Sequence, residues 1–184
     1  MSIRNLVAAL AIVLLPASLF ADDHPYKNVK VGDFATFTTD IKVGTFALKG
    51  TTTVTVTAKS EKEATIKSVA TVNGMTTPPQ VQKIDLTKPY DPASLNGLPP
   101  GTDAKIEKGK EGKEKLTLLG KEYDCDWSTY KIKATVMGQA FDGDIKVWLS
   151  SKIPMGMGKM EMNTSVAGMK MELKMELSET GNKK

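Results

Sequence analysis

The sequence predicts a mostly β protein, a single curled antiparallel sheet or partial barrel with at most one or two short helical turns. Three observations support this fold class. Apolar and polar residues alternate with a period of two through much of the chain, as they do in half-buried strands. Turn signals such as Asn73-Gly74 separate the alternating runs. One long run changes parity partway, which is typical of a strand that bends.

Residues 1–21 have the three parts of a secretory signal peptide. Arg4 supplies a positive charge, and the apolar run from Leu6 to Leu15 is too short to span a bilayer stably. Small residues then precede a predicted cleavage after Ala21. A permanent N-terminal anchor is the alternative, which the short run disfavours. We therefore expect an exported protein, periplasmic or extracellular, with no transmembrane anchor after cleavage.

Cleavage would leave residues 22–184, enough for a single β-rich domain with its own core. The chain has 25 Lys and Arg against 21 Asp and Glu, and Arg4 is its only arginine. Lysine lacks the planar guanidinium fork that favours phosphate recognition, so we expect no nucleic-acid partner. Cys125 is the only cysteine, so the domain has to be held by its core rather than by an internal disulfide.

The predicted strands follow the alternating runs. The clearest run is near the C-terminus, where Lys and Glu fill every position between the apolar residues, whereas a helix would spread these charges around its axis. The alternating apolar positions are Val54, Val56 and Ala58; Ala64, Ile66, Ala70 and Val72; Ile145, Val147 and Leu149; Met160 and Met162; and Met169, Met171, Leu173, Met175 and Leu177.

A parity change marks the middle of the chain. Cys125 and Trp127 share one face with Tyr123, whereas Tyr130 begins an apolar set of the opposite parity. A β-bulge or bend near Ser128-Thr129 would keep both sets inward. Such bending predicts a strand that wraps around a core.

Residues 76–115 are expected to form loops within the domain. The part from 76 to 101 holds six prolines, which cannot belong to a central strand, and Asp91 to Gly97 fits one short helical turn. The segment from Lys105 to Lys115 is rich in Lys, Glu and Gly. We expect it to be a solvated hairpin or a mobile loop.

No recognisable catalytic apparatus is present, and we expect a protein that is not an enzyme. His24 is the only histidine and lies close to the predicted new terminus. Cys125 has acids on both sides, which would raise its pKa and make it a weak nucleophile. The pair Asp124 and Asp126 is expected to face solvent, and Asp142-Gly143-Asp144 is expected to form a turn.

Two features suggest copper as an alternative to the expectation of no cofactor. After cleavage the chain would begin Asp22-Asp23-His24, whose amine, two backbone amides and imidazole can form a square-planar nitrogen site suited to Cu(II). Thioethers are soft ligands that prefer Cu(I), and methionines cluster after Pro154. Both features have simpler explanations, a chance histidine near the terminus and the inward faces of strands.

The C-terminal third resembles a group of uncharacterised exported bacterial β-proteins. The features are Gly120-Lys121-Glu122-Tyr123-Asp124-Cys125, then Lys146-Val147-Trp148-Leu149-Ser150, then Ile153-Pro154 and a methionine-rich strand pair. That order is similar to envelope proteins distantly related to the periplasmic lipoprotein carriers (LolA/LolB-like half-barrels). The resemblance implies a curled sheet whose concave side holds an acyl chain. The chain lacks the carriers' long helices, so a sheet closed on its own side chains is the alternative.

Methionine provides the candidate ligand-binding surface. Seven of the ten methionines fall between residues 155 and 175, where a core built for stability alone would use Val, Ile and Leu, and methionine suits adaptable apolar surfaces. We expect Met155-Gly156-Met157-Gly158 to be a mobile loop, and Trp148 either to pack beneath the proline-rich segment or to be exposed. The candidate residues are Met155, Met157, Met160, Met162, Met169, Met171 and Trp148.

The leading expectation is an exported, non-catalytic β-domain that binds an apolar small molecule, a lipid or an envelope protein. The first alternative is a structural or interaction protein with no small ligand. The second is periplasmic copper binding through the mature N-terminus and the methionines.

Overall fold

The computed structural model describes residues 24–88, 103–136, 139–166 and 169–183. These residues form an all-β fold with no helix among them. The helical turn expected at Asp91 to Gly97 lies outside the described residues. The strands are β1 (Asp33–Val43), β2 (Phe46–Lys59), β3 (Glu63–Val72), β4 (Met75–Thr76), β5 (Gln80–Asp85), β6 (Asp103–Leu118), β7 (Lys121–Val136), β8 (Gln139–Leu149), β9 (Met157–Val166) and β10 (Met169–Asn182).

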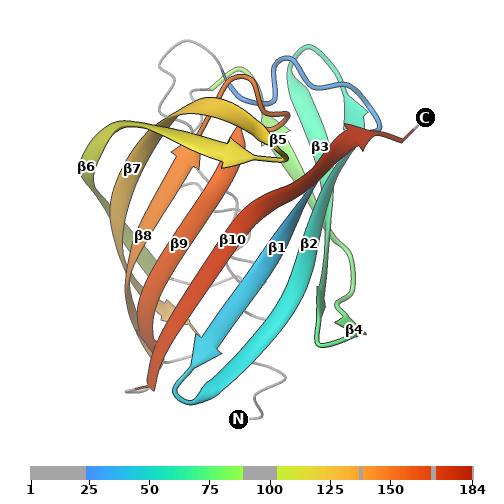
Figure 1. The fold of residues 1–184 in the computed structure, drawn as a ribbon. Coiled ribbons are helices and arrows are strands. Elements are labelled where there is room, and N and C mark those ends of the chain that lie inside the picture. The colour runs from blue at the N-terminus through green and yellow to red at the C-terminus, as the bar shows by residue number, and fades with distance from the viewer. Residues whose placement is uncertain (1–23, 89–102, 137–138, 167–168, 184) are drawn as a thin grey trace.

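All strand pairs are antiparallel and belong to one sheet. Its order is β4-β3-β2-β1-β10-β9-β8-β7-β6, and β5 also pairs with β3. The first and last long strands, β1 and β10, lie side by side in the middle of this order (Figure 1). Within the described residues β6 does not pair with β3, β4 or β5, so the sheet curls without closing into a barrel. The predicted fold class is therefore confirmed.

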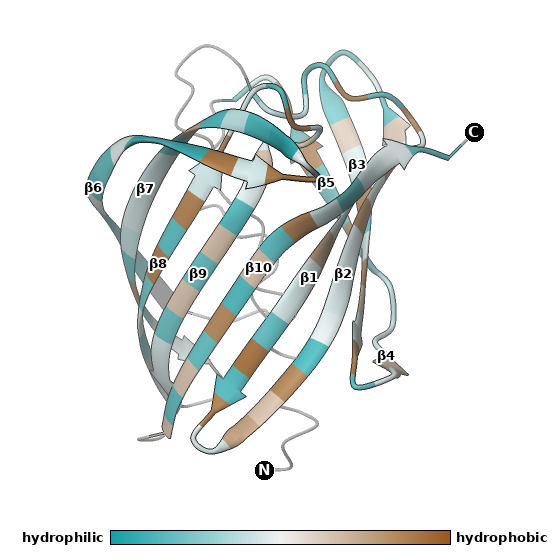
Figure 2. Cartoon of the chain, in the orientation of Figure 1, coloured by the Kyte–Doolittle hydropathy of each residue, from teal (hydrophilic) through white to brown (hydrophobic). Residues whose placement is uncertain are grey.

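The alternating runs form strands because one side of the curled sheet is buried. Figure 2 shows hydrophilic and hydrophobic positions alternating along β8, β9 and β10. The predicted tight turn at Asn73-Gly74 is also present, with φ of 48° and 78° at its two residues. The inner side carries a continuous core that includes Phe37, Ile41, Val54, Val56, Ile66, Ile132, Ile145, Val147, Leu149, Leu173 and Leu177.

The segment expected to be a Lys/Glu-rich loop is instead the edge strand β6, which pairs with β7 along most of its length. Ile106 and Leu116 pack against the core, and Leu118 is buried. Lys and Glu occupy most of the other positions. The expectation of a loop was wrong. Edge strands often carry charged side chains, which prevent pairing with other chains, and these charges hide the apolar alternation by which a strand is recognised in a sequence.

The predicted irregularity near Ser128-Thr129 lies on the neighbouring strand. The pairing of β6 with β7 shifts between Lys108 and Glu111, so that β6 carries the extra residue. The pairing of β7 with β8 stays continuous, with Trp127 opposite Trp148 and Ser128 opposite Val147. Directly paired residues project to the same side of a sheet. Trp127 therefore faces the outer side with Trp148 and does not join the core.

Three further segments differ from expectation. β5 lies within the range expected to form loops, and it pairs antiparallel with β3; it contains none of the six prolines. Asp142-Gly143-Asp144 lies inside β8 rather than in a turn, and an added Cβ at Gly143 would meet Thr164 on β9 at 3.0 Å. Met155 and Met157 are buried rather than on a mobile loop. Their glycine neighbour Gly156 has a φ of 83°, and its carbonyl accepts a 2.8 Å hydrogen bond from the backbone nitrogen of Ser150, so that the turn is fastened to the end of β8.

In the part of the chain that the structure describes, no helix is long and apolar enough to cross a membrane.

Candidate functional site

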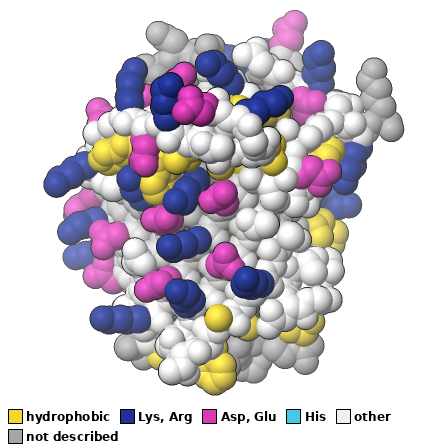
Figure 3. Space-filling view, viewed as in Figure 1, with side chains coloured by type: hydrophobic (Ala, Val, Ile, Leu, Met, Phe, Trp, Pro, Cys, Tyr) yellow, Lys and Arg dark blue, Asp and Glu magenta, His cyan; other side chains and the backbone are white. Residues whose placement is uncertain are grey.

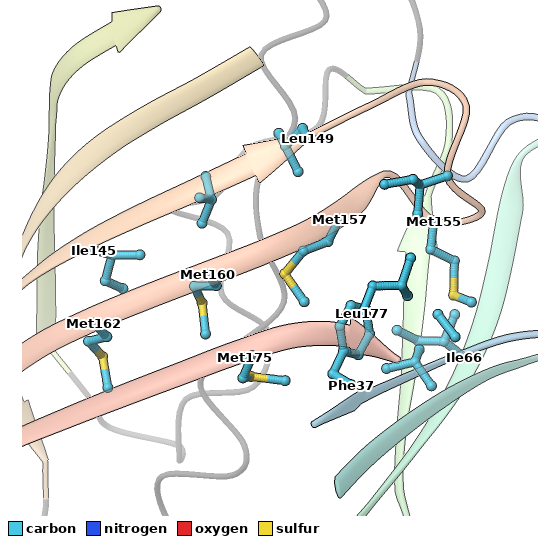
Figure 4. Packing of buried hydrophobic residues seen from close by; sticks show 14 of the residues in the cluster. Phe37, Ile66, Ile145, Leu149, Met155, Met157, Met160, Met162, Met175 and Leu177 are labelled. Atoms are coloured by element: carbon cyan, nitrogen blue, oxygen red, sulfur yellow. The ribbon is translucent and has the colours of Figure 1, made fainter. Parts of the chain in front are cut away.

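The methionines of β9 and β10 line the inner side of the curled sheet. Met160 lies opposite Met175 on β10 and opposite Val147 on β8. Met162 occupies the next inward position of β9, and Met171 lies further along β10 toward the hairpin that joins these strands. Figure 4 shows Met157, Met160, Met162 and Met175 projecting into one apolar cluster. Each of these side chains is buried.

Two of the candidate methionines lie at opposite ends of this surface. Met155 is in the turn before β9 and is buried at one end of the sheet. Met169 starts β10 at the other end and is 52% exposed. Met169 and Met171 are two residues apart and therefore lie on the same side of β10. The apolar inner side thus continues from a buried position to solvent.

Trp148 does not belong to this inner surface. It lies on the outer side of β8, only 3% exposed, and its indole nitrogen donates a 2.8 Å hydrogen bond to Oε2 of Glu114 on β6. The ammonium group of Lys146 lies 4.3 Å from the Trp148 ring centroid and 4.4 Å from that of Trp127, close enough for cation–π attraction. Lys159 approaches the Trp148 ring from β9 at 4.8 Å. The candidate set thus divides between the two sides of the sheet.

Two residues that complete this outer cluster could not be identified from the sequence. Glu114 and Gly112 both lie in the segment expected to be a loop. A Cβ at Gly112 would stand 2.7 Å from a ring carbon of Trp127, so only glycine lets this ring lie flat against β6. The available signal was Trp148 itself. An aromatic residue on the polar side of its strand indicates that another segment packs over it.

The predicted copper ligands are partly outside the described residues, since the description begins after Asp23. His24 is buried, and its Nδ1 accepts a hydrogen bond from the backbone nitrogen of Tyr26 at 3.3 Å. Burial lowers the pKa of His24, and the positive charge of Lys27 lowers it further. No cluster of three or more His, Cys, Asp or Glu suited to a metal occurs within the described part of the chain. Copper binding stays a prediction.

A recess of about 250 Å³ lies beside His24, between the N-terminal segment and the turn before β9. Its lining includes Asn28, Asp33 and Lys152 together with Ile153 and Met155. The recess is therefore a mixed polar and apolar surface, and of the candidate methionines it reaches only Met155.

Cys125 is 3% exposed and lies outside the main core cluster. Burial raises its pKa to about 11, and the neighbouring carboxylates of Asp126, Asp124 and Glu114 contribute in the same direction. The thiol is therefore almost fully protonated at neutral pH and is a poor nucleophile or metal ligand.

The fold and this inner side define a class of protein: a single open antiparallel sheet, curled around an apolar concave side. A solved structure from Bacteroides fragilis, described as an exported protein with a YmcC-like fold, is similar to it with a TM-score of 0.50. The similarity covers 83% of this chain and 97% of that one at 12% sequence identity, so it concerns the fold alone. No family model matches the chain, and no curated protein matches it significantly.

Proposed function

We propose that this chain is an exported, non-catalytic protein that binds an apolar ligand, such as an acyl chain, on the concave side of its sheet. The observation that carries this proposal is the convergence of Met157, Met160, Met162, Met171 and Met175 on the inner side of two adjacent strands. The resemblance of the C-terminal third to the half-barrels of lipoprotein carriers supports an acyl chain as the ligand.

The chemistry of methionine supports an adaptable surface over a purely structural one. Its unbranched side chain has three rotatable bonds and a polarisable sulfur, so it can repack at low cost. The branched side chains of Val and Ile are stiff at χ1. Since the inner methionines are buried, a ligand gains room only when they change rotamer. Strands rich in methionine permit that change while the apolar contact area is kept.

A non-catalytic role agrees with the side chains that the structure describes. His24 is buried with a lowered pKa, and Cys125 is buried with a raised one. General acid–base or nucleophilic chemistry needs a group whose pKa is matched to the working pH and which can reach a substrate. Neither group meets both requirements.

The test combines lipid analysis with a fluorescent probe. Solvent extraction of the protein purified from its native host, followed by mass spectrometry, should yield a stoichiometric lipid, and a dansyl-labelled fatty acid should bind the delipidated protein. Replacing Met160 and Met162 by Val stiffens the surface and should weaken probe binding about tenfold. The matched change Met75→Val, at a methionine that is exposed and lies outside the candidate surface, should leave probe binding unaltered. A protein that carries no lipid and binds no probe would instead have a structural or interaction role.

A further inference from the structure

The inner apolar side reaches solvent at the end of the sheet where the β1–β2 and β9–β10 hairpins turn. Phe46 pairs with Val43, and Val43 pairs with Met171, so these three residues form one row on the inner side. Phe46 is 66% exposed and Met169 is 52% exposed, whereas Met171, two residues further in, is 3% exposed. The apolar lining therefore extends beyond the buried core as a rim.

The two hairpins form one continuous edge. The backbone nitrogen of Gly44 donates a 3.2 Å hydrogen bond to the carbonyl oxygen of Lys170. The third hairpin, β3–β4, is fastened to the same edge through Asn73, whose backbone nitrogen donates to the carbonyl oxygen of Lys49 at 2.9 Å. That hairpin presents Met75, which is 55% exposed.

The opposite end of the sheet is different, because apolar side chains close it. Tyr26 and Val29 of the N-terminal segment and Ile153 of the turn before β9 are each buried there. The β2–β3 turn at that end carries Glu61 and Glu63 together with Lys59 and Lys62, so its charges balance. An apolar rim joined to the inner side is thus a feature of the hairpin end.

The charge of this end is positive. The hairpin segments 41–49, 70–77 and 164–171 contain Lys42, Lys49 and Lys170 and no Asp or Glu. Neither Lys49 nor Lys170 makes a salt bridge within the described part of the chain. Two acids stand just behind the rim.

Of these acids, Asp40 pairs in register with Lys49, and Glu172 lies 4.0 Å from Lys42. Exposed pairs of this kind contribute little. Figure 3 shows both charge signs mixed over the middle of one face and hydrophobic side chains at its lower end.

We propose that this hairpin end docks the protein on an anionic lipid bilayer, with Phe46 and Met169 entering the interface and Lys49 and Lys170 facing the headgroups. An apolar edge flanked by lysine is the combination that binds membrane surfaces, since burial of apolar area and attraction to anionic lipid add together. The docking goes beyond the proposed function. We also infer that a lipid from the bilayer enters the concave side through this rim, and this second step rests on the proposed function.

The test is sedimentation of the exported protein with vesicles of phosphatidylcholine, with and without phosphatidylglycerol. We expect binding that needs the anionic lipid and weakens as salt is raised. The double variant Phe46→Ser/Met169→Ser should bind about tenfold more weakly, and Lys49→Gln and Lys170→Gln about fivefold each. The matched controls are Val81→Ser, at a residue 68% exposed on β5, and Lys113→Gln on β6.

The outcomes separate the two proposals. The controls should bind as the unchanged protein does, and circular dichroism should confirm that all variants fold. Failure of the protein to bind either vesicle, or an equal loss in Val81→Ser, would overturn the docking. The lysine variants Lys49→Gln and Lys170→Gln should keep their affinity for the dansyl-labelled fatty acid without vesicles. Vesicle binding by a protein that takes up no fatty acid would sustain the docking and reject the ligand.

Discussion

The indole nitrogen of Trp148 donates a hydrogen bond to Oε2 of Glu114 over 2.8 Å, and this bond joins β8 to β6 across the intervening strand β7. Lys146 lies 3.6 Å from the same carboxylate and over both tryptophan rings. The edge strand β6, which pairs with only one neighbour, is therefore held by a second set of contacts on the outer side of the sheet. Removing the hydrogen bond between Trp148 and Glu114 should therefore change the free energy of unfolding and its dependence on pH.

We expect Trp148→Phe to lower the free energy of unfolding by about 1 kcal/mol at pH 7, because it deletes this hydrogen bond while keeping an aromatic ring. The pKa of Glu114 is lowered, first by the bond from Trp148 and further by Lys146. A lowered carboxyl pKa gives stability that is present above the unfolded-state pKa and lost as the pH falls through the folded-state pKa. The difference between the variant and the unchanged protein should therefore shrink in acid.

Thermal unfolding at pH 7 and at pH 3 measures this effect. Trp127→Phe is the matched control, since Trp127 lies under the same lysine but does not make the bond to Glu114. An equal pH response in the two variants would show that the bond does not set the pKa of Glu114.

The alternating strands could be predicted because one buried side imposes a period of two on the sequence. The run from Met169 to Leu177 is the clearest case, and its structure confirms the pattern. β6 could not be predicted in the same way. Among the described strands it pairs with β7 alone, so it buries little apolar area, and its lysines and glutamates resemble those of a solvated loop.

The inner methionines could likewise be predicted from local alternation, whereas the outer cluster around Trp148 could not. Met160 and Met162 follow from local alternation alone. The position of Trp148 depends on Glu114, which is 34 residues away in sequence and reaches it only once β6 and β7 have paired in register. Register between distant strands is set by the whole sheet. Met155 and Met157 were expected to be mobile because of their glycines, whereas the positive φ of Gly156 allows a tight, buried turn.

The inner methionines should contribute strongly to stability. Met160 is 1% exposed, and Met160→Ala should lower the free energy of unfolding by about 2–5 kcal/mol through lost burial and a residual cavity. Met169→Ala changes the same side chain at an exposed position and should cost less than about 0.5 kcal/mol. Urea denaturation of both variants measures the difference. Similar losses would mean that the two methionines share one environment in solution.

Cys125 should be almost inert in the folded protein. With a pKa of about 11, about one thiol in a thousand is ionised at pH 8, and burial restricts access further. Labelling with iodoacetamide at pH 8 should therefore be at least about a hundredfold slower in the native protein than in guanidinium chloride. A native rate close to the unfolded one would show that the outer side of β7 opens readily near Cys125.

Copper binding at the N-terminus would have to compete with the fold. The predicted nitrogen site uses Nδ1 of His24, because that atom closes the chelate ring with the preceding amide. In the structure the same atom accepts a hydrogen bond from the backbone nitrogen of Tyr26, and the imidazole is buried. Copper therefore binds only after His24 leaves this position. The free energy needed for that step lowers the affinity of the protein for copper.

We expect Cu(II) to bind the protein cleaved after Ala21 at least about tenfold more weakly than it binds a synthetic peptide of residues 22–27. Titration followed by visible absorption measures both affinities. Bound copper should also lower the thermal midpoint of unfolding, since it favours the state in which His24 has left its buried position. The variant His24→Ala should abolish copper binding and with it the shift of the midpoint. Equal affinities for the protein and the peptide would show that the contact between His24 and Tyr26 does not hold the terminus in solution, because a buried imidazole could not serve the metal without a measurable penalty.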